Sequence, residues 1–187
     1  MIHSPQITCL LDTNVIVPIE VRDLLFWFAH DDLYIPRWSR HIFDEWVSVM
    51  RRRGISETEI KKRLRWANLA FPFAAVKDYE HLIQQLDLPD PKDRHVLAAA
   101  IKSKADFIIT NNLKDFPQDY LASFEILAKS PDDFLSELIT IHPKVAVRSF
   151  RKLVANRRNP NLNELQVIEN LKRNRLIHTA RTLLTHI

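Results

Sequence analysis

The strongest constraint on the fold is an alternation of short apolar runs with longer segments of helical pattern. The apolar runs lie at residues 7–11, 33–35, 74–76, 107–109 and 124–127. Each is too short for a helix, and the run at 107–109 is apolar on both faces, as in a strand inside a parallel sheet. Strands that alternate with helices are joined by right-handed crossovers. The sequence therefore predicts an α/β fold with a central parallel sheet flanked by helices.

Helix-start signals stand at the beginning of several of the longer segments. Ser39 is predicted to cap a helix that ends near Gly54, and Ser56 with Glu59 has the spacing of a capping box. Asp90 precedes a proline that suits the first turn of a helix reaching about residue 104. Two further helices are expected, one from Pro18 to about residue 30 and one capped by Asp78 and reaching about residue 86.

The chain has one glycine and one cysteine, Gly54 and Cys9, and both counts exclude classes of protein. A P-loop needs two glycines and a dinucleotide-binding fingerprint needs three, because the backbone must approach phosphates closely. A lone cysteine allows neither an intrachain disulfide nor a Cys-rich zinc site. The first residues make a poor signal peptide, and no apolar stretch reaches the ~20 residues that span a bilayer. A soluble cytoplasmic protein without membrane association is expected.

The pattern changes after residue 130. Helical segments are predicted at 132–141, 144–156, 163–172 and 174–186, without a convincing strand. Residues 1–130 carry 17 Lys/Arg and 18 Asp/Glu, whereas residues 131–187 carry 10 and 5. We therefore divide the chain into an α/β unit, 1–130, and a basic all-helical C-terminal extension, 131–187. The charge favours an acidic partner such as nucleic acid, and a solvated helical face explains it equally well.

Three acidic residues far apart in sequence are candidates for one site. Asp12 ends the first strand and opens a predicted loop, residues 12–14, at the place where open α/β sheets bind ligands. A cap or turn residue is the alternative for Asp12. Glu45 shares a helix face with Ile42 and Val49, and a carboxylate on an apolar face needs a partner, for which His41 is a structural candidate. Asp93 lies in the first turn of its helix, where capping is the alternative role.

A second polar group follows the buried run 107–109. Thr110, Asn112 and Asp115 should lie near Asp12, because the carboxyl ends of parallel strands meet at one edge of the sheet. Oxygen donors of this kind suit Mg²⁺ or Mn²⁺. No pair of histidines at metal-ligand spacing competes with them.

Together these segments resemble the PIN-domain family. The resemblance rests on LLDTN at 10–14, Glu45 within SRHIFDEW, DPKDRHVLAAAIKSKADFIITNNLKDF at 90–116, and the gaps between them. More narrowly, they resemble the VapC-type toxin ribonucleases. This resemblance is specific over residues 7–128. The segment PDDFLSEL at 131–138 and the basic helical end resemble the C-terminal extension of that branch.

The resemblance implies an Mg²⁺- or Mn²⁺-dependent endoribonuclease, the toxin of a type II toxin–antitoxin system, that leaves a 5′-phosphate and a 3′-hydroxyl. It implies that Asp12, Glu45 and Asp93 bind the metal and that Asp115 assists catalysis. Asn112 stands at the family's fourth acidic position, where an asparagine lowers the negative charge of the site. The number of bound metal ions, one or two, therefore stays open. Asn14 and Thr110 are expected to support the site. The implied partners are the RNA substrate and a cognate antitoxin, and a second copy of the chain stays a candidate.

Two other functions compete with the nuclease. One is a non-catalytic nucleic-acid-binding or regulatory protein that uses the basic C-terminal helices. The other, a phosphotransfer domain, is disfavoured, because Asn14 replaces the second aspartate of HAD-type phosphatases and receiver domains need an acidic pair that is missing. For RNA binding the candidates are one cluster at a helix end and another on the next helix, with solvated faces as the alternative: Arg51, Arg52, Arg53, Lys61, Lys62, Arg63 and Arg65.

Overall fold

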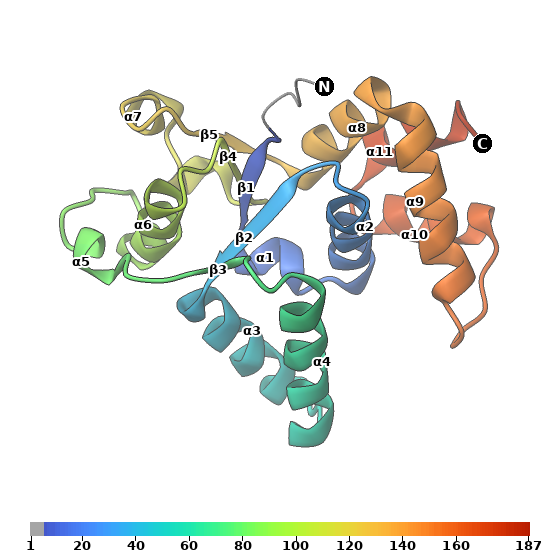
Figure 1. Ribbon diagram of the computed structural model, residues 1–187, viewed down its shortest axis with the longest axis horizontal. Coiled ribbons are helices and arrows are strands. Elements are labelled where there is room, and N and C mark those ends of the chain that lie inside the picture. Colours follow the sequence, from blue (N-terminus) through green and yellow to red (C-terminus); the bar gives the residue numbers. More distant parts are fainter. Residues whose placement is uncertain (1–5) are drawn as a thin grey trace.

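The computed structural model of the protein describes residues 6–187, so the first five residues of the predicted 1–130 unit lie outside the described residues. Its core is a five-stranded sheet in the order β3-β2-β1-β4-β5, in which every neighbouring pair is parallel. Helices cover both faces of this sheet (Figure 1). The predicted α/β fold is therefore confirmed. The strands are β1 Thr8–Leu11, β2 Ile35–Ser39, β3 Ala75–Val76, β4 Phe107–Ile109 and β5 Leu127–Lys129.

The helices follow the strands in the expected alternation. Figure 1 shows α3 and α4 projecting together from one edge of the sheet, with α6 beside the strands and the C-terminal helices gathered next to α2. The α-helices are α1 Thr13–Ile16, α2 Ile19–His30, α3 Arg40–Arg52, α4 Glu57–Ala70, α5 Glu80–Ile83, α6 Arg94–Lys102, α7 Gln118–Ala122, α8 Pro131–Ile141, α9 Pro143–Asn156, α10 Glu164–Arg173 and α11 Ile177–Leu184, with short 3₁₀ turns η1 Pro91–Asp93 and η2 Leu113–Asp115.

The helix starts predicted from capping residues are confirmed at three places. The Ser39 side chain accepts from the Ile42 backbone N–H, and that of Ser56 accepts from Glu59 N–H. Asp90 accepts from the N–H of Lys92 at the start of η1, which runs directly into α6. Each cap satisfies a backbone donor that the first helical turn leaves without a partner.

Two strand predictions were placed a few residues too early. The second strand is Ile35–Ser39 rather than 33–35, because its sequence, IPRWS, interrupts the apolar pattern although Trp38 is fully buried. The last strand is Leu127–Lys129 rather than 124–127, because Glu125 has φ +59 and lies in a turn. Lys129 belongs to β5 because it pairs with Ile109 of β4, and its ammonium group lies 4.6 Å from the centre of the Phe107 ring.

Two local predictions were wrong. Asp78 does not cap a helix: its φ of +57 is left-handed, and the helix that follows, α5, is a single turn without a side-chain cap. The polar residues after β1, predicted as a loop, begin a one-turn helix, α1. Asp12 is the N-cap of that helix, and Asn14 lies within it. This turn brings both side chains to the edge of the sheet.

The helices after residue 130 pack against the same core. Residues 131–187 hold no strand, as predicted. Phe134 of α8 packs edge-to-face on Tyr34, with the ring centres 5.1 Å apart. Asp31, at the C-terminal end of α2, accepts hydrogen bonds from Ser149 and Lys152 of α9 at 2.6 Å each. Within residues 6–187, none of the helices has the length and apolar character that a bilayer crossing requires.

Candidate functional site

The register of the sheet places Asp12 beside Thr110. Leu11 of β1 pairs with Ile109 of β4, so the next residue of each strand emerges at the same edge. The Thr110 hydroxyl donates to Asp12 Oδ2 at 2.7 Å, and the Asn14 amide donates to the same oxygen. Asp12 Oδ1 accepts from the Thr13 backbone N–H. Asp12 is therefore both the cap of α1 and a buried carboxylate at the carboxyl edge of the sheet.

Glu45 reaches this edge from α3. Thr13, next to Asp12, donates its hydroxyl to Glu45 Oε2. The other oxygen, Oε1, lies 3.1 Å from Nε2 of His95, a buried residue of α6. The Glu45 side chain remains 47% exposed, so one carboxylate is held by two neighbours and still open to solvent.

Asp93 joins the group through Asn112. The Asn112 side-chain N–H groups donate to Asp93 and to Asp115, and the Asn112 backbone N–H donates to the Thr110 hydroxyl. Asp93 makes no side-chain cap to α6, so the structural alternative for this residue is wrong. A continuous chain of hydrogen bonds thus connects the predicted carboxylates with one another.

The electrostatics of the edge show the same proximity. Burial raises the pKa of Asp93 to about 6, and the negative charges of Asp12, Asp90 and Asp115 act in the same direction. Burial also raises the pKa of Asp12 above its usual value, against the hydrogen bond from Thr110, and the Glu45 charge adds to the increase. The pKa of Glu45 is lowered: burial opposes this, and hydrogen bonds from His95 and Thr13 outweigh it.

Residues that the sequence analysis did not select hold this site together. The partner of Glu45 is His95 rather than His41, which instead stacks on the His95 ring with the centres 5.2 Å apart. His41 Nδ1 in turn lies 2.5 Å from the hydroxyl of the buried Tyr79. The sequence offered one signal for His95: it lies two residues after Asp93 among the apolar residues of α6.

The donor set suits a hard divalent cation, although no cage is formed in advance. Among residues 6–187, no three His, Cys, Asp or Glu side chains are already arranged to enclose a metal ion. Several carboxylate oxygens instead accept hydrogen bonds from Thr13, Asn14 and Asn112. In the same part of the chain, the basic side chain within 4 Å of these carboxylates is His95, which contacts Glu45. Clustered oxygen donors that raise one another's pKa, without a Lys or Arg between them, fit Mg²⁺ or Mn²⁺.

The predicted basic residues divide between two surfaces. Arg51 and Arg52 line a hollow of about 720 Å³ together with Thr13 and Glu45 of the site. Arg63 lines a different pocket, on the α2 side of α4, and pairs with Glu59. The remaining members of the two clusters lie exposed at the end of α3 and on α4: Arg53, Lys61, Lys62 and Arg65.

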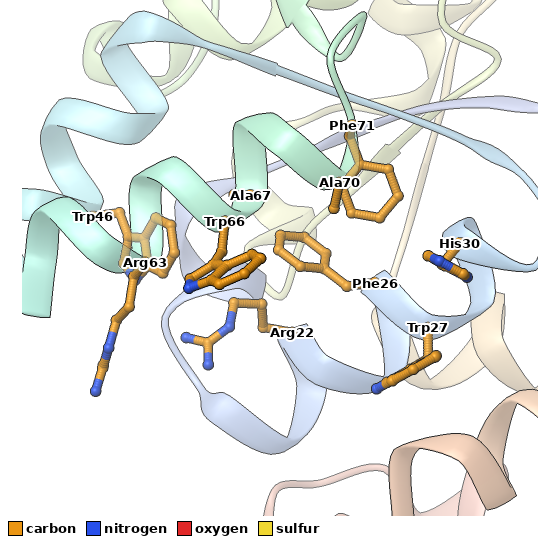
Figure 2. Close-up of a pocket in the computed structure, with 10 residues that line it drawn as sticks. All are labelled: Arg22, Phe26, Trp27, His30, Trp46, Arg63, Trp66, Ala67, Ala70 and Phe71. Atoms are coloured by element: carbon orange, nitrogen blue, oxygen red, sulfur yellow. The ribbon is translucent and has the colours of Figure 1, made fainter. Parts of the chain in front are cut away.

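The pocket that Arg63 lines is apolar and lies between α2 and α4. Figure 2 shows side chains of both helices facing one another across it, among them Phe26 and Trp66. Its volume is about 310 Å³, and Trp66 is 62% exposed at its rim. The guanidinium of Arg22 lies 5.4 Å from the centre of the Trp46 ring. An exposed aromatic surface of this kind is typical of protein–protein contacts.

Comparison with known proteins gives matches to both parts of the chain. The model described as "PIN domain" matches residues 8–114, more than half of the chain, and the model described as "VapC50 C-terminal domain" matches residues 131–185. A curated Mycobacterium tuberculosis protein named "Putative ribonuclease VapC50" is 51% identical over 51 residues. That match spans 27% of this chain and 30% of the relative. No solved structure is significantly similar to the chain.

Proposed function

Because the chain belongs to the PIN-domain family, we propose that it is a metal-dependent endoribonuclease and the toxin of a type II toxin–antitoxin pair. The observation that carries the proposal is the hydrogen-bonded group of carboxylates at the carboxyl edge of the sheet, Asp12, Glu45, Asp93 and Asp115. The relative's name and the C-terminal match support the narrower assignment to a VapC-type ribonuclease.

In this proposal the carboxylates of Asp12, Glu45 and Asp93 hold the metal, and Asp115 assists. A bound Mg²⁺ or Mn²⁺ supplies two things, a water of lowered pKa and stabilisation of charge on the scissile phosphate. The other residues orient the carboxylates. Thr110 and Asn14 fix Asp12, and Asn112 lies between Asp93 and Asp115.

Thr13 and His95 orient Glu45. The Thr13 hydroxyl donates to one carboxylate oxygen, Oε2, and His95 contacts the other, Oε1. The stacked His41 and the buried Tyr79 keep the His95 ring in place. Partners of this kind behind a ligand fix its direction and tune its basicity. We propose that Arg51 and Arg52, which line the adjoining hollow, contact RNA phosphates, since both lie exposed there; Arg51 also pairs with Glu57, and no such pair is formed by Arg52 within residues 6–187.

Product analysis with and without metal tests the enzyme. The full chain, freed of metal, should leave an RNA intact in EDTA and cleave it once Mg²⁺ or Mn²⁺ is restored. Titration calorimetry should detect Mn²⁺ binding on its own, without RNA. Cleavage in excess EDTA would refute metal dependence. An RNA that binds and is never cut, with any of these ions, would favour the non-catalytic RNA-binding protein instead.

The proposed protein partner is a cognate antitoxin, and the α2–α4 pocket supports a protein contact there. Phe26, Trp46 and Trp66 offer apolar surface that a partner side chain would remove from water (Figure 2). Expression of the chain should arrest growth, and co-expression of a small protein encoded beside it should relieve the arrest. Trp66→Glu should still arrest growth and resist relief. Equal relief of both variants would remove the pocket from the contact.

The division at residue 130 and the location of the protein are also proposals. The α8 helix begins at Pro131, capped by Ser130, which supports separating 1–130 from 131–187. We place the protein in the cytoplasm, where its RNA substrate is made. A chain ending at Ser130 that folds and keeps metal-dependent cleavage would support the division, and one that cannot fold would make residues 131–187 part of a single unit.

A further inference from the structure

The α9 helix has one buried face and one basic outer face. Ala146, Phe150 and Leu153 are buried on the side that packs on α2. Lys144, Arg148 and Arg151 recur at intervals of four and three residues, which places them in one stripe on the helix surface. All three are exposed. No Asp or Glu occurs in α9 to neutralise them.

This stripe borders a hollow of about 770 Å³. His186, beyond the end of α11, lines the hollow from the other side, and Lys152 adds a further cation. Arg151 pairs with Glu164 and Lys152 pairs with Asp31. Within residues 6–187, by contrast, Lys144 and Arg148 form no ion pair and no acidic side chain lines the hollow. Two cations that line it, Lys144 and Arg148, are therefore not neutralised.

The lining of this hollow distinguishes its ligand from that of the α2–α4 pocket. Its apolar members are small or largely buried, Pro143, Val147 and Ala155, and none is aromatic. The α2–α4 pocket is lined by Phe26, Trp46 and Trp66. Protein interfaces rely on aromatic anchors, whereas backbone contacts to nucleic acid rely on cations and need none. The outer face of α9 therefore suits an extended polyanion better than a folded protein.

The C-terminal end of α9 lies towards the candidate active site. In the second half of α9, Lys152 pairs with Asp31, which follows the C-terminal end of α2. Just after its last residue, Arg157 pairs with Glu20 in the first turn of α2. Because α2 follows α1 after two residues, this end of α9 lies towards the edge that holds Asp12. The exposed Arg158 extends the positive charge in that direction.

We propose that the outer face of α9, centred on Lys144 and Arg148, binds the sugar–phosphate backbone of RNA outside the active site. Its choice of RNA among polyanions rests on the proposed function. The face holds a second part of the strand whose scissile bond lies at the carboxyl edge. This contact increases the affinity for RNA and lengthens the stretch of strand that the protein binds, and it takes no part in the chemistry.

Binding in EDTA, where the proposed chemistry is switched off, tests this directly. The probe is a fluorescein-labelled single-stranded 20-nucleotide RNA, titrated with the full chain at several salt concentrations. The variant Lys144→Glu/Arg148→Glu should bind about tenfold more weakly at low salt. Its log–log salt slope should fall by about 1.4, two lost contacts at roughly 0.7 each for a single strand.

The matched control is Lys102→Glu/Arg173→Glu, which makes the same change of net charge on exposed residues of α6 and α10. It should leave the slope within error of the wild type. The milder Lys144→Gln/Arg148→Gln should show the same loss if the double reversal unfolds the helix. An unchanged slope in the α9 variants, an equal loss in the control, or no RNA binding by the wild type would overturn the proposal. Displacement of the RNA by poly-L-glutamate at equal charge would also overturn it, in favour of an acidic protein.

Hydrolysis of bis(p-nitrophenyl) phosphate with Mn²⁺ separates this proposal from the enzyme itself. That substrate is too small to reach α9, so the α9 variants should hydrolyse it as the wild type does. If the wild type hydrolyses neither this ester nor RNA but binds RNA through α9, the nuclease proposal fails and the α9 surface stands. If cleavage is metal-dependent and the α9 variants bind RNA normally, the reverse holds.

Discussion

The carboxyl edge of the sheet and the outer face of α9 carry opposite charges and hold them in different ways. At the edge, Asp12 and Asp93 are fixed by hydrogen bonds, and burial, with the neighbouring negative charges, raises the pKa of both. On α9, Lys144 and Arg148 extend into solvent without a partner within residues 6–187. Carboxylates fixed in this way suit chemistry at one point, because a bound cation offsets the cost of holding several negative charges close together. Free charge suits affinity for a long strand.

The largest effect should come from removing one charge at the edge. Asp93→Asn should lower RNA cleavage by at least about 100-fold, because the metal loses a ligand worth several kcal/mol to the transition state. The fold should not lose stability: because the pKa of Asp93 is raised to about 6 in the folded state, its ionised carboxylate, which predominates at pH 7, destabilises the folded state relative to the unfolded one. Cleavage rates measure catalysis, Mn²⁺ calorimetry measures metal affinity, and thermal melting measures the stability of the fold.

Asp119→Asn is the matched control, since Asp119 also lies in the first turn of a helix, α7, but is exposed and belongs neither to the edge nor to the hollow beside it. It should change none of the three. Normal cleavage by folded Asp93→Asn would show that the edge does not depend on this carboxylate, and the contrast with α9 would then lose its basis.

The next effect concerns the partner of Glu45. His95→Ala should weaken metal binding and cleavage by roughly 10–100-fold, as loss of an orienting partner behind a metal ligand does. His95→Gln, which keeps an N–H donor, should recover part of this loss in Mn²⁺ affinity as well as in rate. His81→Ala, at an exposed position of α5, is the control. If Gln and Ala behave alike, His95 acts through packing and does not orient Glu45.

A smaller effect is expected where α9 is anchored to α2. Burial alone would raise the pKa of Asp31, but hydrogen bonds from Lys152, Ser149 and His30 lower it to about 2. The stability from this ionised group is complete above its unfolded pKa near 4 and is lost as the pH falls towards 2. We expect Asp31→Asn to cost roughly 1–2 kcal/mol at pH 7 and almost nothing at pH 2, measured by urea unfolding.

Asp32→Asn is the control, at an exposed position next along the chain. If Asp31→Asn lowers the free energy of unfolding as much at pH 2 as at pH 7, the Asp31 side chain stabilises the contact between α2 and α9 through packing and not through its charge. Asp31→Asn also leaves Lys152, which lines the α9 hollow, without its acidic partner, so the salt slope of RNA binding should not fall in this variant.

The smallest effect is expected at the rim of the edge. Arg52→Ala should weaken RNA binding only a few-fold, since one exposed phosphate contact is lost, and it should lower the salt slope by about 0.7. Arg53→Ala is the control, because Arg53 is exposed without lining the hollow beside Glu45. A drop for Arg52→Ala larger than that for the α9 reversal would place the main RNA affinity at the edge and weaken the division between the two surfaces.

The sequence by itself determined the order of strands and helices and the residues gathered at the edge. Apolar periodicity and caps such as Ser39 and Ser56 are local properties, so the α3 and α4 starts could be predicted. The parallel arrangement followed from the alternation. Asp12 and Thr110 could be paired in advance because each directly follows a buried strand. Strand limits failed where Pro36 or Glu125 interrupts the apolar pattern and tertiary packing decides the pairing.

Only the tertiary structure decided which side chain holds which. His95 supports Glu45, although fifty positions separate them, because α3 and α6 meet at the same edge. Sequence spacing carries no information about contacts across such distances. The same holds for the basic residues: Arg52 faces the edge, Arg63 lines the apolar pocket and Lys152 is neutralised by Asp31. Basic residues that look equivalent in the sequence therefore have different roles in the structure. The free energy of each charge depends on the burial and the partners that tertiary packing gives it.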